Sequence, residues 1–164
     1  MATLIERLNA LADDVSNTIE RVNNGGCAVF ASHVAYHLKY VRGVKEVVVR
    51  AGDYDSHGGR LSVDAARKKV KKSNALPCDW NSAGVFFSHV IVEFTYRKKK
   101  YHYDSHSGVV SETRETHYGE YPLYKGGMTV EEGLAIASTP IGWNPTFNRK
   151  NIPRMIKLIN KHLG

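Results

Sequence analysis

The run from Val85 to Tyr96 restricts the fold more than any other segment of the chain. It reads Val-Phe-Phe-Ser-His-Val-Ile-Val-Glu-Phe-Thr-Tyr and is apolar on both faces except at a few positions. Such a run is typical of a strand inside a sheet that is covered on both sides. A two-residue tip at Arg97-Lys98 and a return strand from Lys99 to Asp104 are expected to follow, and Val109-Val110 extends the sheet or starts another strand. The sequence therefore predicts an antiparallel sheet.

Helical segments are expected before this sheet. Apolar residues recur at spacings of three and four over residues 3–22, which predicts an amphipathic helix. The Asn and Gly residues at 23–26 end that helix, because both types tolerate positive φ. A second helix is expected over residues 27–43, and its apolar residues on most sides predict a central, buried position. Residues 44–50 are rich in β-branched side chains and predict a further strand.

Three more helices complete the predicted fold. They are a short basic helix over residues 62–72, a capped helix over 129–137 and a basic amphipathic helix over 151–163. Ser62 is expected to cap the first of them, and Thr129, with Glu132 three residues later, the second. The chain has 164 residues, of which 42% are hydrophobic and 24% charged, as in an ordinary globular protein. We therefore predict one α+β domain over residues 1–164.

The charge of the chain and its first residues indicate which partners and which cellular compartment to expect. The net charge is +7 and the pI is near 9.4, which favours acidic partners. Basic residues gather at 67–72 and 97–100, so nucleic acid is a candidate partner through these basic segments. No apolar run approaches the ~20 residues that cross a bilayer, and the first residues lack the order of a signal peptide. We expect a cytoplasmic protein with no membrane partner; the sequence does not specify an oligomeric state.

Cys27 is the candidate nucleophile. It follows Gly25 and Gly26 and opens an apolar helix. Unpaired backbone N–H groups and the positive end of the helix dipole favour thiolate over thiol there, and the thiolate is the reactive form. The two glycines would let an acyl group approach the sulfur. The alternative is a buried core cysteine. Cys78, in an irregular stretch beside Asp79, is interpreted as structural or redox-labile, and two cysteines do not form a disulfide framework.

His89 and Asp104 are the candidate partners of this thiol. His89 lies inside the apolar strand, and Asp104 follows fifteen residues later on the expected return strand. With this odd separation, both side chains point to the same sheet face, directly opposite for a two-residue tip near Tyr96-Arg97 and one diagonal apart for a tip at Arg97-Lys98. A four-residue tip at Arg97 to Lys100 would place them too far apart. The carboxylate could then orient the imidazole, which would act as general base and then as general acid. A histidine that is simply satisfied within the core is the alternative.

Three short motifs together resemble a known class of enzyme. They are Gly-Gly-Cys-Ala-Val-Phe-Ala at 25–31, Ser-His-Val-Ile-Val at 88–92 and Tyr-Asp-Ser-His-Ser-Gly at 103–108. In this order they resemble the papain-like and transglutaminase-like cysteine enzymes, and most closely small phage-type or bacterial members. The resemblance covers about residues 20–110, except for the 45–83 insertion, and does not include the C-terminal third. It implies an α+β fold in which N-terminal helices, including the helix of the nucleophile, pack on an antiparallel sheet.

The same resemblance implies a role for each residue. Cys27 would be the nucleophile, His89 the base and Asp104 the residue that orients it. The implied activity is thiol-dependent acyl transfer, as in a cysteine peptidase, an amidase or deamidase, or a transglutaminase-like enzyme. The substrate would be a protein, a peptide or a small amide or ester, and no cofactor is expected.

Four further residues are candidates for the oxyanion hole and the substrate cleft. Gly26 brings the backbone close to the developing oxyanion, and Asn23 or Asn24 could add a side-chain amide donor. The related enzymes often have a Gln or another polar residue before the cysteine, at a different spacing from these asparagines. Trp143, in the stretch Gly-Trp-Asn-Pro-Thr-Phe, either lines the cleft or packs the last helix onto the sheet.

Two other classes of function stay open at this point. His102, Asp104 and His106 alternate, and on an extended strand they would form a metal site of two histidines and a carboxylate; His33 and His37 lie one helical turn apart. The residues after Asp104 are expected to turn, which would break the alternation, and we predict no metal. The second alternative is a non-enzymatic basic binding module, for nucleic acid or a protein partner, on a degenerate cysteine-protease-like fold.

Overall fold

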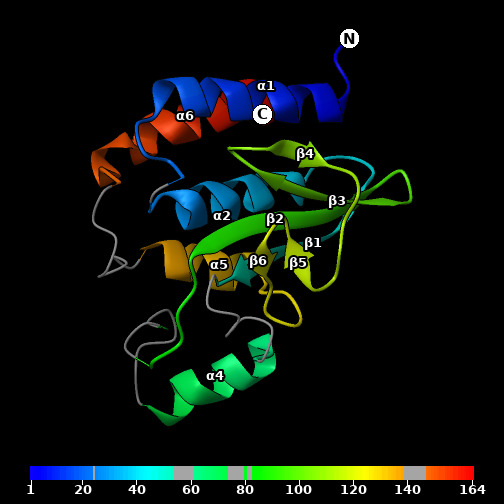
Figure 1. Ribbon diagram of the computed structural model, residues 1–164. Helices are drawn as coiled ribbons and strands as arrows, with labels where there is room; N and C mark the ends of the chain where they lie inside the picture. Colours follow the sequence, from blue (N-terminus) through cyan, green and yellow to red (C-terminus); the bar gives the residue numbers. More distant parts are fainter. Residues whose placement is uncertain (24, 54–60, 74–79, 81–82, 139–146) are drawn as a thin grey trace.

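A computed structural model gives a mixed α+β fold built on an antiparallel sheet (Figure 1). The structure describes residues 1–23, 25–53, 61–73, 80, 83–138 and 147–164. The sheet has the strand order β1 (Val44–Gly52), β2 (His89–Tyr96), β3 (Lys99–Asp104) and β4 (Gly108–Val110). A separate two-stranded sheet pairs β5 (His117–Tyr118) with β6 (Tyr121–Pro122).

Five α-helices and one 3₁₀ helix are seen in the described part of the chain. They are α1 (Leu4–Thr18), α2 (Cys27–Leu38), α4 (Val63–Lys72), α5 (Val130–Ser138), η1 (Arg149–Asn151) and α6 (Ile152–Leu163). Each of the helices predicted from the sequence is therefore present. The first two end four to five residues earlier than predicted.

Local capping explains where several helices begin. Thr3 and Glu6 form a reciprocal capping box at the start of α1, in which each side chain accepts a backbone N–H of the other residue. Ser62 accepts the backbone N–H of Ala65 and caps α4, as predicted. The side chain of Thr129 accepts the backbone N–H of Glu132 before α5, also as predicted.

The β2–β3 hairpin sets the register of the sheet. Tyr96 pairs with Lys99, so the tip consists of Arg97 and Lys98 as predicted. Both tip residues have positive φ, 51° and 64°, which gives the turn the twist that two-residue hairpins need.

The predicted strand start at Val85 is wrong, because β2 begins at His89. The preceding residues are held by non-sheet contacts instead. Gly84 has a positive φ of 76°, and the backbone N–H of Val85 donates to the carbonyl of Trp80. The backbone N–H of Ser88 then donates to Gly52 at the end of β1. Val85 and Phe87 are buried within this loop while Phe86 is exposed, so two of these apolar residues reflect loop burial rather than further strand pairing.

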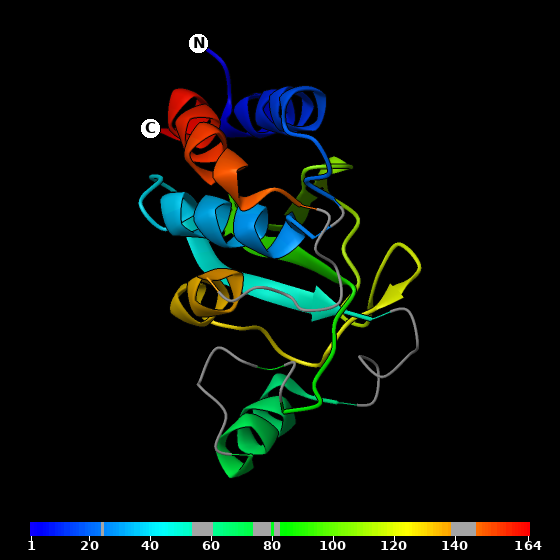
Figure 2. The same ribbon diagram turned by 90° about the vertical axis from the view of Figure 1, so that its left-hand side faces the viewer.

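Helices cover one face of the sheet in two layers (Figures 1 and 2). Nine of the twelve residues of α2 are buried, and this helix lies between the sheet and the outer pair α1 and α6. Val90, Val92 and Phe94 of β2 pack in the same core as α2. Ile91 points to the opposite face, where it packs with Tyr118 and Leu123. The predicted central position of the second helix is confirmed.

The alternation along β2 and β3 places the candidate side chains on one face. His89 and Ile91 lie two residues apart on β2, as do His102 and Asp104 on β3, so all four share the face that the 117–123 segment covers. The described residues contain no helix that is long and apolar enough to span a membrane.

Candidate functional site

Cys27 is the first residue of α2 and is buried, with 6% of its surface exposed and its thiol free. The N-cap residue is Gly26, which has no side chain. The backbone N–H groups in the first turn of α2 therefore donate no hydrogen bond to a capping side chain. These groups lie where an oxyanion beside the sulfur could accept their hydrogen bonds. The sequence-based position of Cys27 at the start of a buried helix is therefore confirmed.

Gly26 has a packing role that the sequence did not reveal. A Cβ atom at this position would lie 2.7 Å from the backbone oxygen of Val22 and 2.8 Å from a ring carbon of Phe147. Its φ of −97° is open to any residue, so close approach and not backbone conformation requires glycine. Gly25 differs, because its φ of 102° lies in the region that favours glycine. The two glycines thus shape the entry to α2 for separate physical reasons.

His89 and Asp104 form a buried hydrogen-bonded pair at the ends of β2 and β3. The distance from His89 Nε2 to Asp104 Oδ2 is 2.7 Å, and both side chains are less than 10% exposed. In the observed register Asp104 lies across from Ile91, so the two partners are one diagonal apart. The diagonal pairing follows from the two-residue tip that the sequence predicted.

The Asp104 carboxylate is fixed by the turn that follows β3. Its Oδ1 atom accepts the backbone N–H groups of His106 at 3.0 Å and Ser107 at 2.6 Å, while Oδ2 faces His89. Burial opposes ionisation of this carboxyl, but the hydrogen bonds from His89 and the Ser107 backbone prevail and lower its pKa. A carboxylate only accepts, so His89 Nε2 carries the hydrogen of the shared bond.

The surroundings of His89 favour the imidazolium form. Burial lowers the pKa of His89, but the interactions with the Asp104 carboxylate and the Cys27 sulfur outweigh it and raise the pKa to about 9. Because Nε2 is bound to Asp104, the other ring nitrogen, Nδ1, is the one left for the thiol. His89 lies on the sheet face opposite α2, but as the first residue of β2 it still interacts with the first residue of α2.

Two tyrosines that the sequence analysis did not identify stack on the imidazole. The Tyr121 ring lies 5.0 Å and the Tyr118 ring 5.8 Å from the His89 ring between centroids, with interplanar angles of 26° and 24°. Both come from the β5–β6 hairpin. Gly52 permits this hairpin to approach, since a Cβ there would lie 3.0 Å from the backbone oxygen of Pro122 and 3.3 Å from Tyr121. Only tertiary contacts place these rings, so no local sequence pattern points to them.

Asn23 lies beside the strand end that carries Asp104. Its Oδ1 atom accepts a hydrogen bond of 2.5 Å from Ser105 Oγ, which leaves the amide N–H groups of Asn23 as donors. The other proposed cleft residues, Asn24 and Trp143, and the second cysteine, Cys78, lie outside the described residues.

The proposed metal ligands do not converge. His102 Nε2 lies 2.7 Å from Glu93 Oε2, Asp104 is bound to His89, and His106 lies exposed in the turn after β3. Among the residues that the structure describes, no three His, Cys, Asp or Glu side chains are grouped to hold a metal ion.

The comparisons with known proteins add no relative. The chain matches no protein-family model, no curated protein and no solved structure. The candidate site is therefore defined by its own geometry.

A second buried polar cluster shares the sheet face of His89 and Asp104. Arg50 Nη1 donates to Glu93 Oε2 at 2.7 Å, and the same oxygen binds His102. Burial raises the pKa of Glu93, but His102 and the cations Arg50 and Lys100 lower it to about 2. The cluster holds β1, β2 and β3 together through one ionised carboxylate. Arg50 and Glu93 were visible in the sequence as charges within apolar strands, which is the signal that would have found them.

The basic segments occupy separate places in the fold. α4 projects at one end of the molecule, and the β2–β3 tip lies away from it (Figure 1). Arg67 of α4 is engaged by Glu132 and Asp64, whereas the lysines of this helix are exposed. The two basic segments therefore do not combine into one surface.

Proposed function

We propose that the chain is a thiol-dependent acyl-transfer enzyme with a papain-like or transglutaminase-like fold. Cys27 is the nucleophile, His89 the general base and acid, and Asp104 the residue that orients the imidazole. The substrate is a protein, a peptide or a small amide or ester. No cofactor takes part in this chemistry.

One observation carries the proposal: a single buried imidazole interacts both with the thiol that opens α2 and with a fixed carboxylate. The 2.7 Å bond to Asp104 and the interaction with Cys27 together hold the pKa of His89 near 9. An imidazolium at neutral pH beside a sulfur is the arrangement that stabilises a reactive thiolate. A histidine that merely filled the core would need a hydrogen-bond partner, as His102 has in Glu93, but it would not need a thiol.

The proposed reaction proceeds in two acyl transfers. The Cys27 thiolate attacks the substrate carbonyl carbon, and the backbone N–H groups at the start of α2 stabilise the resulting oxyanion. The imidazolium of His89 gives its Nδ1 proton to the leaving amine or alcohol as the bond to carbon breaks, which leaves a thioester. Neutral His89 then takes a proton from an incoming water or amine, which attacks the thioester and releases Cys27.

The acyl acceptor decides the type of enzyme. Attack by water makes the protein a peptidase, amidase or deamidase, and attack by an amine makes it a transferase. Asp104 has the same role in both, because it stabilises the imidazolium and keeps Nε2 protonated.

The test uses p-nitrophenyl acetate as an acyl donor and intact-protein mass spectrometry as the readout. We expect an acetyl thioester on Cys27, with release of p-nitrophenolate, and removal of the acetyl group by added methylamine. Iodoacetamide labelling at neutral pH should modify Cys27 at least about tenfold faster than Cys78, because thiolate reacts and thiol does not.

His89→Ala should slow both reactions at Cys27 without slowing Cys78. His33→Ala is the matched control, since His33 is a partly buried histidine of the same helix as Cys27 and has no role in the proposal. Circular dichroism checks that the variants are folded. Equal, slow labelling of both cysteines in the folded wild-type protein would exclude the proposed function.

A further inference from the structure

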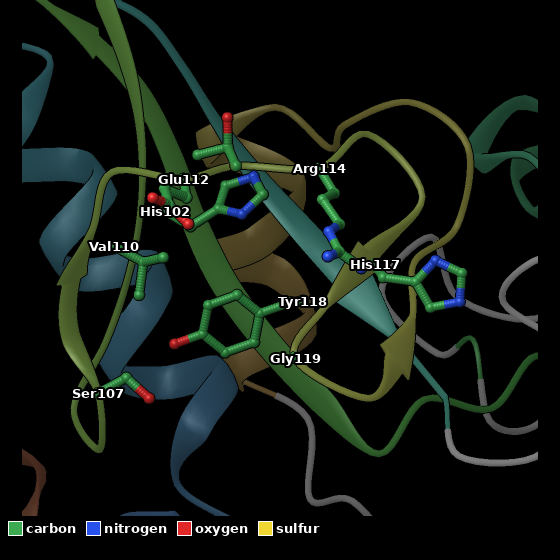
Figure 3. A pocket seen from close by; sticks show the side chains of 9 residues that line it. His102, Ser107, Val110, Glu112, Arg114, His117, Tyr118 and Gly119 are labelled. Atoms are coloured by element: carbon green, nitrogen blue, oxygen red, sulfur yellow. The ribbon is translucent and has the colours of Figure 1, made fainter.

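A pocket is lined by Tyr118, whose ring stacks on His89, and by Ser107, whose backbone N–H donates to Asp104 (Figure 3). Its volume is about 510 Å³, within the ~300–1,000 Å³ range of small-molecule sites. The lining combines the apolar surfaces of Val110 and Tyr118 with the hydroxyls of Ser107 and Thr113. Cys27 does not line this pocket, so the site is distinct from the proposed nucleophile.

Two opposite charges on the pocket wall have no partner in the described part of the chain. Glu112 and Arg114 both line the pocket and are both exposed, and they form no ion pair with each other or with another described residue. Figure 3 shows them on the same loop, with Glu112 on the side of His102 and Arg114 on the side of His117. A ligand could therefore meet both charges at once.

Other charges near the pocket are already compensated. Lys100 lies 2.9 Å from Glu115 and 3.5 Å from Glu93, and Arg50 is bound to Glu93. His102 is held by the same carboxylate. These groups supply no free charge to a ligand, so the electrostatic character of the site comes from the carboxylate and the guanidinium on the 112–114 segment.

The ligand chemistry follows from this wall. A guanidinium binds a carboxylate through two parallel hydrogen bonds, and a free carboxylate accepts hydrogen bonds from an ammonium group. An apolar side chain of the ligand would pack on Val110 and the ring of Tyr118. A purely anionic ligand would be repelled by the Glu112 carboxylate, and a purely cationic ligand would be repelled by the Arg114 guanidinium.

We propose that this pocket binds a small zwitterion of the amino-acid class, with its carboxylate on Arg114 and its ammonium group on Glu112. The ligand would contact Ser107 and Tyr118. Both residues also interact with Asp104, Ser107 through its backbone N–H and Tyr118 through its hydroxyl. The binding itself does not depend on the proposed acyl-transfer activity.

The test is a two-dimensional ¹H–¹⁵N NMR titration of the full chain with three probes. L-leucine carries both charges, N-acetyl-L-leucine only the carboxylate and L-leucinamide only the ammonium group. We expect L-leucine at millimolar concentrations to shift the backbone resonances of Ser107, Tyr118 and Gly119. Each single-charge probe should bind roughly tenfold more weakly, which corresponds to the loss of about 1.4 kcal/mol for one charged contact.

Variants assign the two contacts. Arg114→Gln should weaken L-leucine binding roughly tenfold and remove the advantage of L-leucine over L-leucinamide. Glu112→Gln should weaken it similarly and remove the advantage over N-acetyl-L-leucine. Arg42→Gln and Glu20→Gln, at exposed positions of the same residue types, are the controls and should leave the affinity unchanged. Shifts confined to other residues, equal binding of all three probes or no shift at all would overturn the proposal.

Discussion

The pKa of His89 is the most direct physical test of the candidate site. Asp104→Asn keeps the size of the side chain but removes its negative charge and one of its two acceptor oxygens, which bind His89 and the backbone N–H groups of His106 and Ser107. The lost charge is the one that stabilises the imidazolium. We expect the pKa of His89 to fall from about 9 by at least about one unit, because the remaining partner, Cys27, must then offset burial alone.

The magnitude follows from the same geometry. A rise of the pKa from 6.5 to about 9 corresponds to roughly 3 kcal/mol of preference for the imidazolium, at about 1.4 kcal/mol for each tenfold change in the protonation equilibrium. Asp104 and Cys27 supply this preference together and also cancel the cost of burial. Cys27→Ser should therefore lower the pKa of His89 as well.

The measurement is an NMR pH titration of the imidazole resonances in histidine-labelled protein. Asp14→Asn is the control, because Asp14 binds His162 Nε2 at 2.6 Å at the helical side of the molecule and does not contact His89. The reasoning is refuted by a wild-type His89 that titrates near 6.5. It is equally refuted by a pKa of His89 that stays the same in Asp104→Asn.

Three further predictions concern stability and are measured by chemical denaturation. Gly26→Ala should lower the free energy of unfolding by about 1–3 kcal/mol, because the added Cβ lies 2.8 Å from the Phe147 ring; wild-type stability would contradict the close packing. Arg50→Met should cost about 3 kcal/mol by leaving the buried Glu93 carboxylate without its guanidinium, and a neutral effect would show that the ion pair is dispensable. The raised pKa of His89 adds stability that is complete below pH 6.5 and is lost as the pH rises through about 9, so His89→Gln should flatten the pH dependence in that range.

The sequence was most informative where the geometry is local. The spacing from His89 to Asp104 and the two-residue tip were enough to place both side chains on one face, because strand periodicity and turn length determine the register. The tip itself, Arg97 and Lys98, lacks the Asn-Gly or Asp-Gly pair typical of such turns. Its position was predicted from the end of the apolar pattern, and both residues adopt positive φ although neither is glycine.

Long-range contacts could not be derived from the sequence. Tyr118 and Tyr121 reach His89 through a hairpin whose residues show no regular pattern, and Gly52, far away in the chain, makes room for it. The strand start was wrong for a related reason: Phe87, before β2, is apolar and buried, yet this segment packs as a loop. Apolar composition reports burial, and only the pairing partner decides whether a buried segment is a strand.

Two His–carboxylate pairs lie on the same sheet face, and their surroundings give them different roles. The Glu93 carboxylate interacts with His102, Arg50 and Lys100. Its negative charge is therefore compensated within a cluster that joins three strands. Asp104 instead accepts a hydrogen bond from His89 through Oδ2, while its Oδ1 atom accepts backbone N–H groups.

The Cys27 thiol is a second difference between the two His–carboxylate pairs. The interaction with Cys27 is among the causes that raise the pKa of His89, whereas the ring of His102 lies edge-on to Tyr118 and is 1% exposed. A histidine at hydrogen-bond distance from a carboxylate is thus insufficient evidence of catalysis. A carboxylate that is free of other cations, together with the interaction with the Cys27 sulfur, is what makes His89 the candidate base.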